Sequence, residues 1–175
     1  ALARAIALSP KYLFCDEPNS GLDPKTAIVI DNLIQEITQD FDITTIINHL
    51  KDNKAKYTIS NAIGFIGTSA GAHLSLLWSY AFDANSNVNM VCSIVGPTNF
   101  TDPAYLNNTD PNLQALLDLY GENATTSFLE ETSPYHQATV LSPPTILFYG
   151  GQDPLIPTTQ GTAMRDQLED LGVTH

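Results

Sequence analysis

Ser69 stands at the centre of a G-x-S-x-G pentapeptide at residues 67–71, a spacing that suits a nucleophilic serine. An apolar run at 62–66 precedes it and a helix-like stretch at 72–79 follows, so the pattern predicts a tight strand-to-helix turn. Such a turn lifts the hydroxyl away from the backbone, and small flanking residues leave room for it. The first N–H groups of the helix, that of Ala70 included, can then bind an oxyanion. We therefore predict acyl transfer through Ser69, with an ordinary glycine-rich turn as the alternative.

Two longer stretches extend this pattern. GFIGTSAGAHLSLL at residues 64–77 is followed by SPPTILFYGGQDPLIP at residues 142–157. Together they resemble the esterase/lipase family of α/β-hydrolases, over roughly residues 54–175. The resemblance implies that the catalytic acid follows a strand in a G-x-x-D-x-x-V/I-P pattern, which places it at Asp153. The alternative for Asp153 is a turn or helix N-cap aspartate.

The resemblance also implies a catalytic histidine, the base that acts together with Ser69 and Asp153. This histidine is harder to assign. His175 follows Asp153 in the chain, as the base does in this family, but Gly172 ends the last predicted helix. His175 therefore begins whatever strand follows, at the amino-terminal edge of a parallel sheet. Ser69 belongs at the other edge, ~17 Å away for a strand of about five residues. A base must lie within about 3 Å of the serine oxygen, so His175 is only a weak candidate.

The same resemblance implies a histidine on the loop after that strand and an upstream H-G-G oxyanion segment, and the sequence shows neither. The chain is thus expected to stop before the catalytic histidine. We expect a serine hydrolase of the carboxylesterase/lipase type that is impaired or inactive. Its substrate would be a small-molecule ester, and its reaction needs no cofactor.

The first 50 residues resemble another family. ALARAIALSPKYLFCDEPNSGLDP at residues 1–24 is similar to the ATP-binding subunit of an ABC transporter, from just after its signature sequence through the Walker B strand and the D-loop. The resemblance implies that Asp16 holds the Mg²⁺ shell and that Glu17 polarises the attacking water. Asp23 would belong to the D-loop.

Residues 44–49 resemble the strand that leads to the switch histidine of that family, here His49, although Asn48-His49-Leu50 replaces the usual Thr-His-Asp. Mg-ATP would be the cofactor. Phosphate binding, however, requires a glycine-rich P-loop with its lysine, and the sequence has none. An ABC-transporter ATPase fragment is therefore the alternative function, and a non-enzymatic α/β chimera is the third.

Two resemblances in one chain predict a chimera. We expect an ATPase-like segment at 1–50 (helix, Walker B strand, helix, strand) and a hydrolase-like segment at 51–175, packed as one compact domain. The seam lies near 44–53. There, residues 44–48 favour a buried strand, while residues 47–57 favour the polar helix that precedes the elbow strand in esterases, and both cannot hold in full.

Short apolar runs that alternate with helical periods predict an α/β fold. We expect a mainly parallel sheet of about five strands with helices on both faces, a partial three-layer sandwich of the α/β-hydrolase kind. The expected strands lie near Tyr12, Thr44, Ala62, Met90 and Thr145. Their carboxyl ends would gather Asp16, Glu17, His49, Ser69 and Asp153 along one edge, where open α/β sheets bind ligands. A weaker hypothesis is that His49 substitutes as the base for Ser69.

The formal net charge is −12, and such a field repels phosphate backbones and anionic membrane surfaces. We expect no nucleic-acid partner and, since no apolar run is long enough to span a bilayer, no direct membrane insertion.

No secretory signal is visible, which slightly favours the cytoplasm. The chain starts at Ala1 in a helical pattern and without Met, which favours a fragment or a trimmed chain. Incomplete edge strands make self-association an open expectation.

Overall fold

A computed structural model describes residues 43–118 and 125–175 of the chain. The chain divides into two compact units, one up to Ile59 and the other from Ser60 onward, and each is described by itself. The strand expected near Tyr12 lies outside the described residues. The expectation that both segments form one compact domain stays a prediction.

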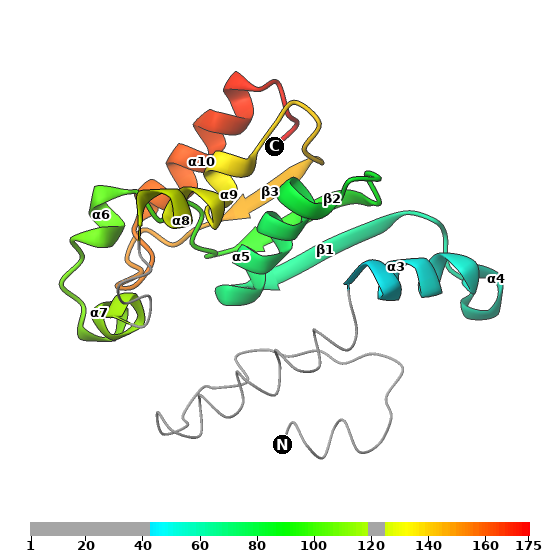
Figure 1. Ribbon diagram of the computed structural model, residues 1–175, viewed down its shortest axis with the longest axis horizontal. Helices are drawn as coiled ribbons and strands as arrows, with labels where there is room; N and C mark the ends of the chain where they lie inside the picture. The colour runs from blue at the N-terminus through cyan, green and yellow to red at the C-terminus, as the bar shows by residue number, and fades with distance from the viewer. Residues whose placement is uncertain (1–42, 119–124) are drawn as a thin grey trace, which may run out of the picture. The chain divides into compact units, whose positions relative to one another are not determined.

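The second unit is built on three parallel strands in the order β1-β2-β3 (Figure 1). These strands are β1 (Ile63–Thr68), β2 (Val88–Ile94) and β3 (Thr145–Phe148). Each coincides within about two residues with an apolar run, so three of the predicted strands and the α/β class are confirmed. Because the strands are parallel, their carboxyl ends meet at one edge of the sheet.

A helix connects the first two strands. α5 (Ala70–Leu77) begins directly after Ser69 and continues as a five-residue π-helix, Trp78–Phe82. It packs against β1 and β2, and the Trp78 ring centroid lies 5.6 Å from that of Phe65 in β1. The start of α5 is therefore held where β1 ends.

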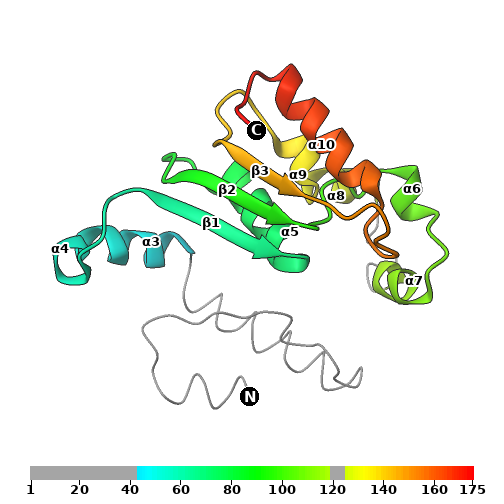
Figure 2. The same cartoon turned by 180° about the vertical axis from the view of Figure 1, so that it is seen from behind.

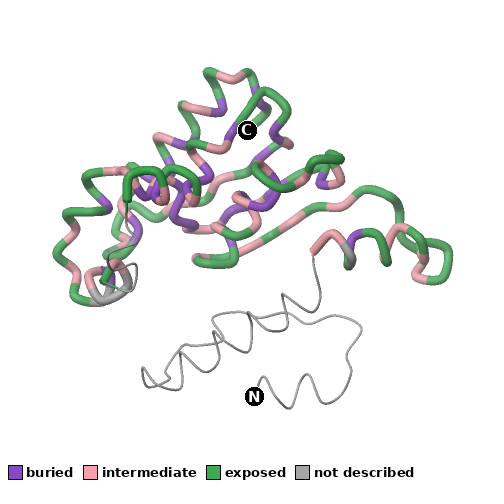
Figure 3. The backbone as a smooth tube through the Cα atoms, viewed as in Figure 1, coloured by how far each residue is buried: buried purple, intermediate pink, exposed green. Residues whose placement is uncertain are grey.

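A long excursion joins β2 to β3 and contains short helices. They are α6 (Pro103–Leu106), α7 (Pro111–Asp118), α8 (Thr126–Glu131) and α9 (Pro134–Gln137). Of these, α6, α7 and α8 lie beyond the carboxyl ends of the strands (Figure 1). Figure 3 shows the buried residues along the same backbone. Tyr105 of α6, Leu113 of α7 and Leu129 of α8 form an apolar cluster with Phe100 and Ile156. Since Ile156 comes from the segment after β3, the excursion and that segment form one packed body.

The last helix, α10 (Thr158–Asp170), follows β3. Met164 and Leu168 are fully buried in a second cluster, against which Leu147 of β3 packs. The helix ends near Gly172, whose φ of 70° is the left-handed conformation that closes many helices. The predicted stop at Gly172 is confirmed.

Within the second unit, helices cover one face of the sheet and leave the other open. Helices α5, α9 and α10 lie on the same side, as the view from behind also shows (Figure 2). The strand register brings four exposed apolar side chains together on the opposite face. They are Ile66, Met90, Ile146 and Phe148, at 69%, 43%, 43% and 55% exposed. The described helices that cover the sheet of the second unit are thus seen on one face of it.

The first unit contributes two helices, α3 (Ile43–Asp52) and α4 (Lys54–Tyr57). The strand expected near Thr44 is therefore wrong, and the competing prediction of a polar helix over residues 47–57 is the better one. The sequence ITTIINHLKD spaces its apolar residues at i, i+3, i+4 and i+7, which is a helical period. Its β-branched residues favour a strand, but the helical spacing of its apolar residues agrees with the helix that the structure shows.

Candidate active site

Ser69 occupies a strained turn between β1 and α5. Its φ of 52° and ψ of −119° lie outside the regions open to most L residues. The Ser69 N–H donates to the carbonyl of Ile94 at 2.9 Å, and the Ser69 carbonyl accepts from the N–H of His73 at 3.0 Å. The turn is thus held at both ends, by β2 and by the first turn of α5. Strain of this kind persists only where the surroundings enforce it.

The two glycines of the pentapeptide have different roles. A Cβ on Gly67 would lie 2.3 Å from the carbonyl oxygen of Gly71, so only glycine fits at that position. A Cβ on Gly71 would meet nothing within 4 Å. The close approach of β1 to α5 therefore depends on Gly67, which lets Ser69 sit at so sharp a bend.

Ala70 is the first residue of α5, and first-turn N–H groups have no partner within their own helix. Its N–H is therefore available at the point where the chain leaves Ser69. The oxyanion-donor role that the sequence pattern assigned to Ala70 stays a prediction.

Asp153 lies in the turn after β3 and is half-buried. Its Oδ1 accepts hydrogen bonds from the N–H groups of Leu155 and Ile156, both at 2.9 Å. Its Oδ2 accepts no hydrogen bond among the residues that the structure describes, so one carboxylate oxygen is free for a further donor. Ser69 follows β1 and Asp153 follows β3, and these parallel strands end at the same edge of the sheet (Figure 1).

A second strained residue stands between them, and the sequence patterns did not reveal it. Val95, directly after β2, has φ 49°, which is rare for a β-branched residue. Its N–H donates to the carbonyl of Phe148 at 2.8 Å, so the strained backbone is tied to the end of β3. Backbone strain concentrates at functional sites, which supports placing the site at this edge.

His175 is not brought to Ser69. The N–H of Thr145, the first residue of β3, donates to the carbonyl of Thr174 at 2.9 Å. His175 therefore lies at the amino-terminal edge of the sheet, as the strand geometry predicted, and its Nδ1 is 3.0 Å from the carbonyl of Val173. As a catalytic base it is on the wrong edge.

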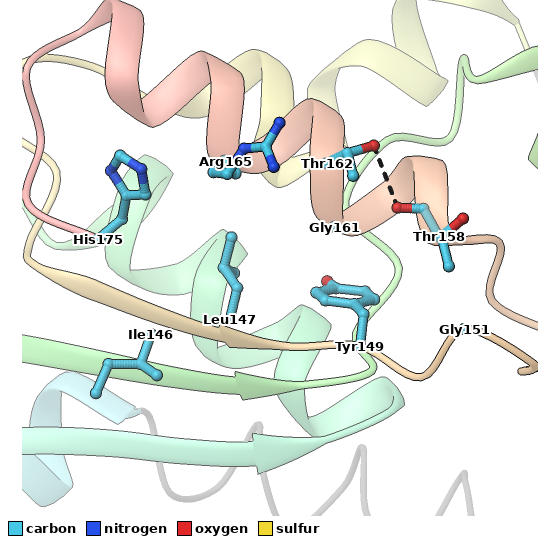
Figure 4. Close-up of a pocket in the computed structure, with 9 residues that line it drawn as sticks. All are labelled: Ile146, Leu147, Tyr149, Gly151, Thr158, Gly161, Thr162, Arg165 and His175. Carbon is cyan, nitrogen blue, oxygen red and sulfur yellow. Dashed lines mark hydrogen bonds between the residues drawn. The ribbon is translucent and has the colours of Figure 1, made fainter.

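His175 instead lines a cavity of about 470 Å³ beside the edge of β3 that faces away from β2 (Figure 4). The other lining residues are Ile146, Leu147, Tyr149, Gly151, Thr158, Gly161, Thr162 and Arg165. Neither Ser69 nor Asp153 lines this cavity, so it is separate from the serine turn.

The remaining histidines of the second unit have other partners. His73 donates from Nδ1 to the carbonyl of Pro97 at 2.9 Å, and burial lowers its pKa despite this hydrogen bond, which favours the charged form. The Nε2 of His136 lies 2.9 Å from the Thr101 hydroxyl. Within the described chain, no histidine ring is hydrogen-bonded to the Ser69 hydroxyl or to the Asp153 carboxylate.

His49 lies within α3, where its Nε2 is 2.9 Å from the hydroxyl of Tyr57. Its supposed place at the end of a strand, the motive for considering it as a substitute base, is therefore wrong.

Asp16, Glu17 and Asp23 lie outside the described residues. Across residues 43–118 and 125–175, no cluster of three or more His, Cys, Asp or Glu side chains could hold a metal ion, and no helix could cross a membrane.

The parallel α/β sheet, with the Ser69 turn after β1 and the Asp153 turn after β3, has the fold of several solved esterases. A truncated carbohydrate esterase from gut microbiota superposes with a TM-score of 0.59 at 20% identity, over 76% of this chain and 56% of that one. An acetyl ester-xyloside bifunctional hydrolase from Caldicellulosiruptor lactoaceticus gives 0.58 at 20%, over 74% and 50%. The carboxylesterase Cest-2923 from Lactobacillus plantarum gives 0.57 at 12%, over 74% and 48%. The chain spans about half the length of these enzymes.

The chain belongs to the BD-FAE family, whose family model matches residues 36–168. This match begins upstream of residue 54, where the esterase resemblance was expected to start. The hydrolase-like part therefore includes α3 and α4.

The ABC-type resemblance also finds relatives, over short stretches. The methionine import ATP-binding protein MetN of Desulfitobacterium hafniense is 51% identical over 45 residues, which are 26% of this chain and 13% of that protein. The phosphate import ATP-binding protein PstB of Spiroplasma kunkelii is 42% identical over 65 residues, or 36% and 24%. The chain spans a quarter or less of these proteins.

Proposed function

We propose that this chain is a serine hydrolase of the carboxylesterase type, with Ser69 as nucleophile, the Ala70 N–H as an oxyanion donor and Asp153 as the acid that orients a histidine. One observation carries the proposal: Ser69 has φ 52° at the bend between β1 and α5, within a chain of the BD-FAE family. A glycine-rich turn with only a structural role has no need of a strained serine at its apex.

The reaction follows from this placement. The Ser69 Oγ attacks the ester carbonyl carbon while a base takes its proton, and the carbonyl oxygen becomes an anion that the Ala70 N–H stabilises. The anion collapses, the alcohol leaves with the proton from the base, and water hydrolyses the acyl-enzyme by the same route. All steps are proton and acyl transfers, so the proposal includes no cofactor.

The proposal does not assign a general base for Ser69. The four histidines of the chain are all described, and no imidazole ring is hydrogen-bonded to the Ser69 hydroxyl or to the Asp153 carboxylate. We therefore infer slow turnover for this chain by itself, since an unassisted serine hydroxyl is a weak nucleophile. Ser69 and its oxyanion donor can still support residual acylation, because electrostatic stabilisation persists without the triad.

The proposed substrate is a small carboxylic ester. Acetyl esters are the natural first choice, since the solved relative from Caldicellulosiruptor lactoaceticus is an acetyl ester-xyloside hydrolase by name. Hydrolysis of p-nitrophenyl acetate should be slow but measurable, and should fall to the background rate in Ser69→Ala. The matched control is Ser75→Ala, which removes a hydroxyl from the same helix. Equal rates in all three proteins would refute the proposal.

A chimera with ABC-type nucleotide binding is the second candidate, favoured by the identity of 51% over 45 residues. A surviving nucleotide site would make Mg-ATP raise the melting temperature, because a ligand that binds only the folded state stabilises it. We expect no shift, since the sequence has no P-loop. A rise that saturates with Mg-ATP would favour the nucleotide-binding candidate instead.

A further inference from the structure

Gln160, in the first turn of α10, is fully buried and binds the loop after β2, residues 95–102, which we call the post-β2 loop. Its Oε1 accepts hydrogen bonds from the N–H groups of Thr98 and Asn99, both at 2.8 Å. Its Nε2 donates to the carbonyl of Asn99 and to Oδ2 of Asp102, both at 2.9 Å. The Thr98 hydroxyl returns a hydrogen bond to the Gln160 carbonyl at 2.6 Å.

This amide uses both of its donor hydrogens and accepts twice at its oxygen, which is the full capacity of a glutamine side chain. A buried group satisfied so completely holds its partners in one arrangement, and removing it would leave two backbone N–H groups without partners. No apolar side chain of the same size supplies these contacts. The first turn of α10 and the post-β2 loop are therefore joined by one side chain.

Two further side chains bind the main chain of the same loop. From α5, His73 donates to the carbonyl of Pro97 at 2.9 Å. From the end of β3, the Tyr149 hydroxyl donates to the carbonyl of Gly96 at 2.5 Å. The post-β2 loop is thus bound by the helix that follows Ser69, by the residue at the end of β3 and by α10.

The Asp153 turn lies between two of these attachments. Tyr149 precedes it by four residues, Gln160 follows it by seven, and Ile156 within it packs in the apolar cluster of the excursion. Movement of α10 away from the post-β2 loop would therefore move the far end of the Asp153 turn. The loop is a common support for the serine side and the acid side of the site.

We propose that Gln160 is a positioning residue, which locks the post-β2 loop to α10 and thereby sets the Asp153 turn relative to the Ser69 turn. This inference rests on the proposed function for its catalytic consequence, but its structural content can be tested separately. A purely local brace would loosen only the amides that Gln160 binds. A positioning residue would also loosen the turns that carry Ser69 and Asp153.

Amide hydrogen exchange of the full chain separates these outcomes. In Gln160→Leu, the Thr98 and Asn99 amides should exchange at least about tenfold faster than in wild type, because they lose their acceptor. The Leu155 and Ile156 amides, which Asp153 binds, should accelerate by a similar factor. The matched control is Gln167→Leu, a half-buried position on the same helix, which should leave all four amides unchanged. Acceleration confined to Thr98 and Asn99 would overturn the proposal.

A second pair of variants exchanges the amide of Gln160 and the carboxylate of Asp102, and tests whether protection against exchange returns. Gln160→Glu sets a second carboxylate against Asp102 and should accelerate exchange in the Asp153 turn, whereas adding Asp102→Asn restores a donor and an acceptor between the two side chains. The double variant should recover part of the protection, because a glutamate at position 160 still has no donor for the Asn99 carbonyl. No recovery would count against the positioning role. Acylation of Ser69 by a fluorophosphonate should follow the same order. If wild-type Ser69 does not react at all, the proposed function fails, while the exchange results still decide the role of Gln160.

Discussion

The N–H of Ser69 donates to the carbonyl of Ile94 at 2.9 Å, so the serine turn is an extension of the pairing between β1 and β2. The next residue, Val95, donates in turn to Phe148 at the end of β3 at 2.8 Å. The carboxyl edge of the sheet therefore continues its hydrogen bonding into the turns that carry the proposed site. Rigid strands, rather than a free loop, hold Ser69 in its strained conformation.

The asymmetry of the two pentapeptide glycines is directly testable. Gly67→Ala should destabilise the fold by about 3 kcal/mol or more, because its Cβ would meet backbone atoms that cannot move aside. Gly71→Ala is the control and should be neutral or stabilising by up to about 1 kcal/mol, since alanine is the better helix former. Urea unfolding measures both. Equal stability of the two variants would contradict the close approach at Gly67.

The strained backbone at Ser69 should lower the free energy of unfolding of the wild-type protein. Ser69→Gly should stabilise the fold by about 1 to 3 kcal/mol, because glycine adopts φ 52° and ψ −119° without the Cβ penalty. Ser69→Ala removes the same hydroxyl but keeps the strain, so its melting temperature should stay near that of wild type. A glycine variant no more stable than the alanine variant would show that the serine backbone is unstrained.

His73 should give the fold a dependence on pH. Burial lowers its pKa below 6.5, so the unfolded chain binds a proton more readily than the folded one. The stability contributed by neutral His73 is present above the unfolded pKa and is lost as the pH falls below about 6.5 toward the folded pKa. His73→Asn keeps a donor for Pro97 and does not titrate, so unfolding free energies from pH 8 to 5 should fall less steeply. An identical slope would exclude His73 as the source.

The open apolar face of the sheet predicts self-association. Ile66 and Phe148 are 69% and 55% exposed on that face, and exposed apolar patches of this kind promote contacts between molecules. The double variant Ile66→Thr with Phe148→Thr should lower the average mass in sedimentation at high concentration. Val140→Thr with Leu141→Thr is the control, since these residues are 70% and 81% exposed in the segment before β3. A monomeric wild type would contradict the expectation.

Local patterns predicted much of the fold but not all of the site. Apolar runs located β1, β2 and β3, and the pentapeptide located the bend at Ser69. The stretch at 44–48 was misassigned because β-branched composition and helical period conflicted there. The Gln160 contacts could not be foreseen, because they join residues about 60 positions apart, and neither could the strain at Val95, because nothing in its local sequence demands a positive φ.

Covalent labelling of Ser69 tests the nucleophile most directly. The full chain is treated with a fluorophosphonate, digested and mapped by mass spectrometry, with Ser69→Ala and Ser75→Ala alongside. A serine at a strained bend beside helix N–H groups should carry the adduct, slowly but selectively, in wild type and in Ser75→Ala but not in Ser69→Ala. An adduct spread over several exposed serines, or none on Ser69 after prolonged treatment, would contradict its role as the nucleophile.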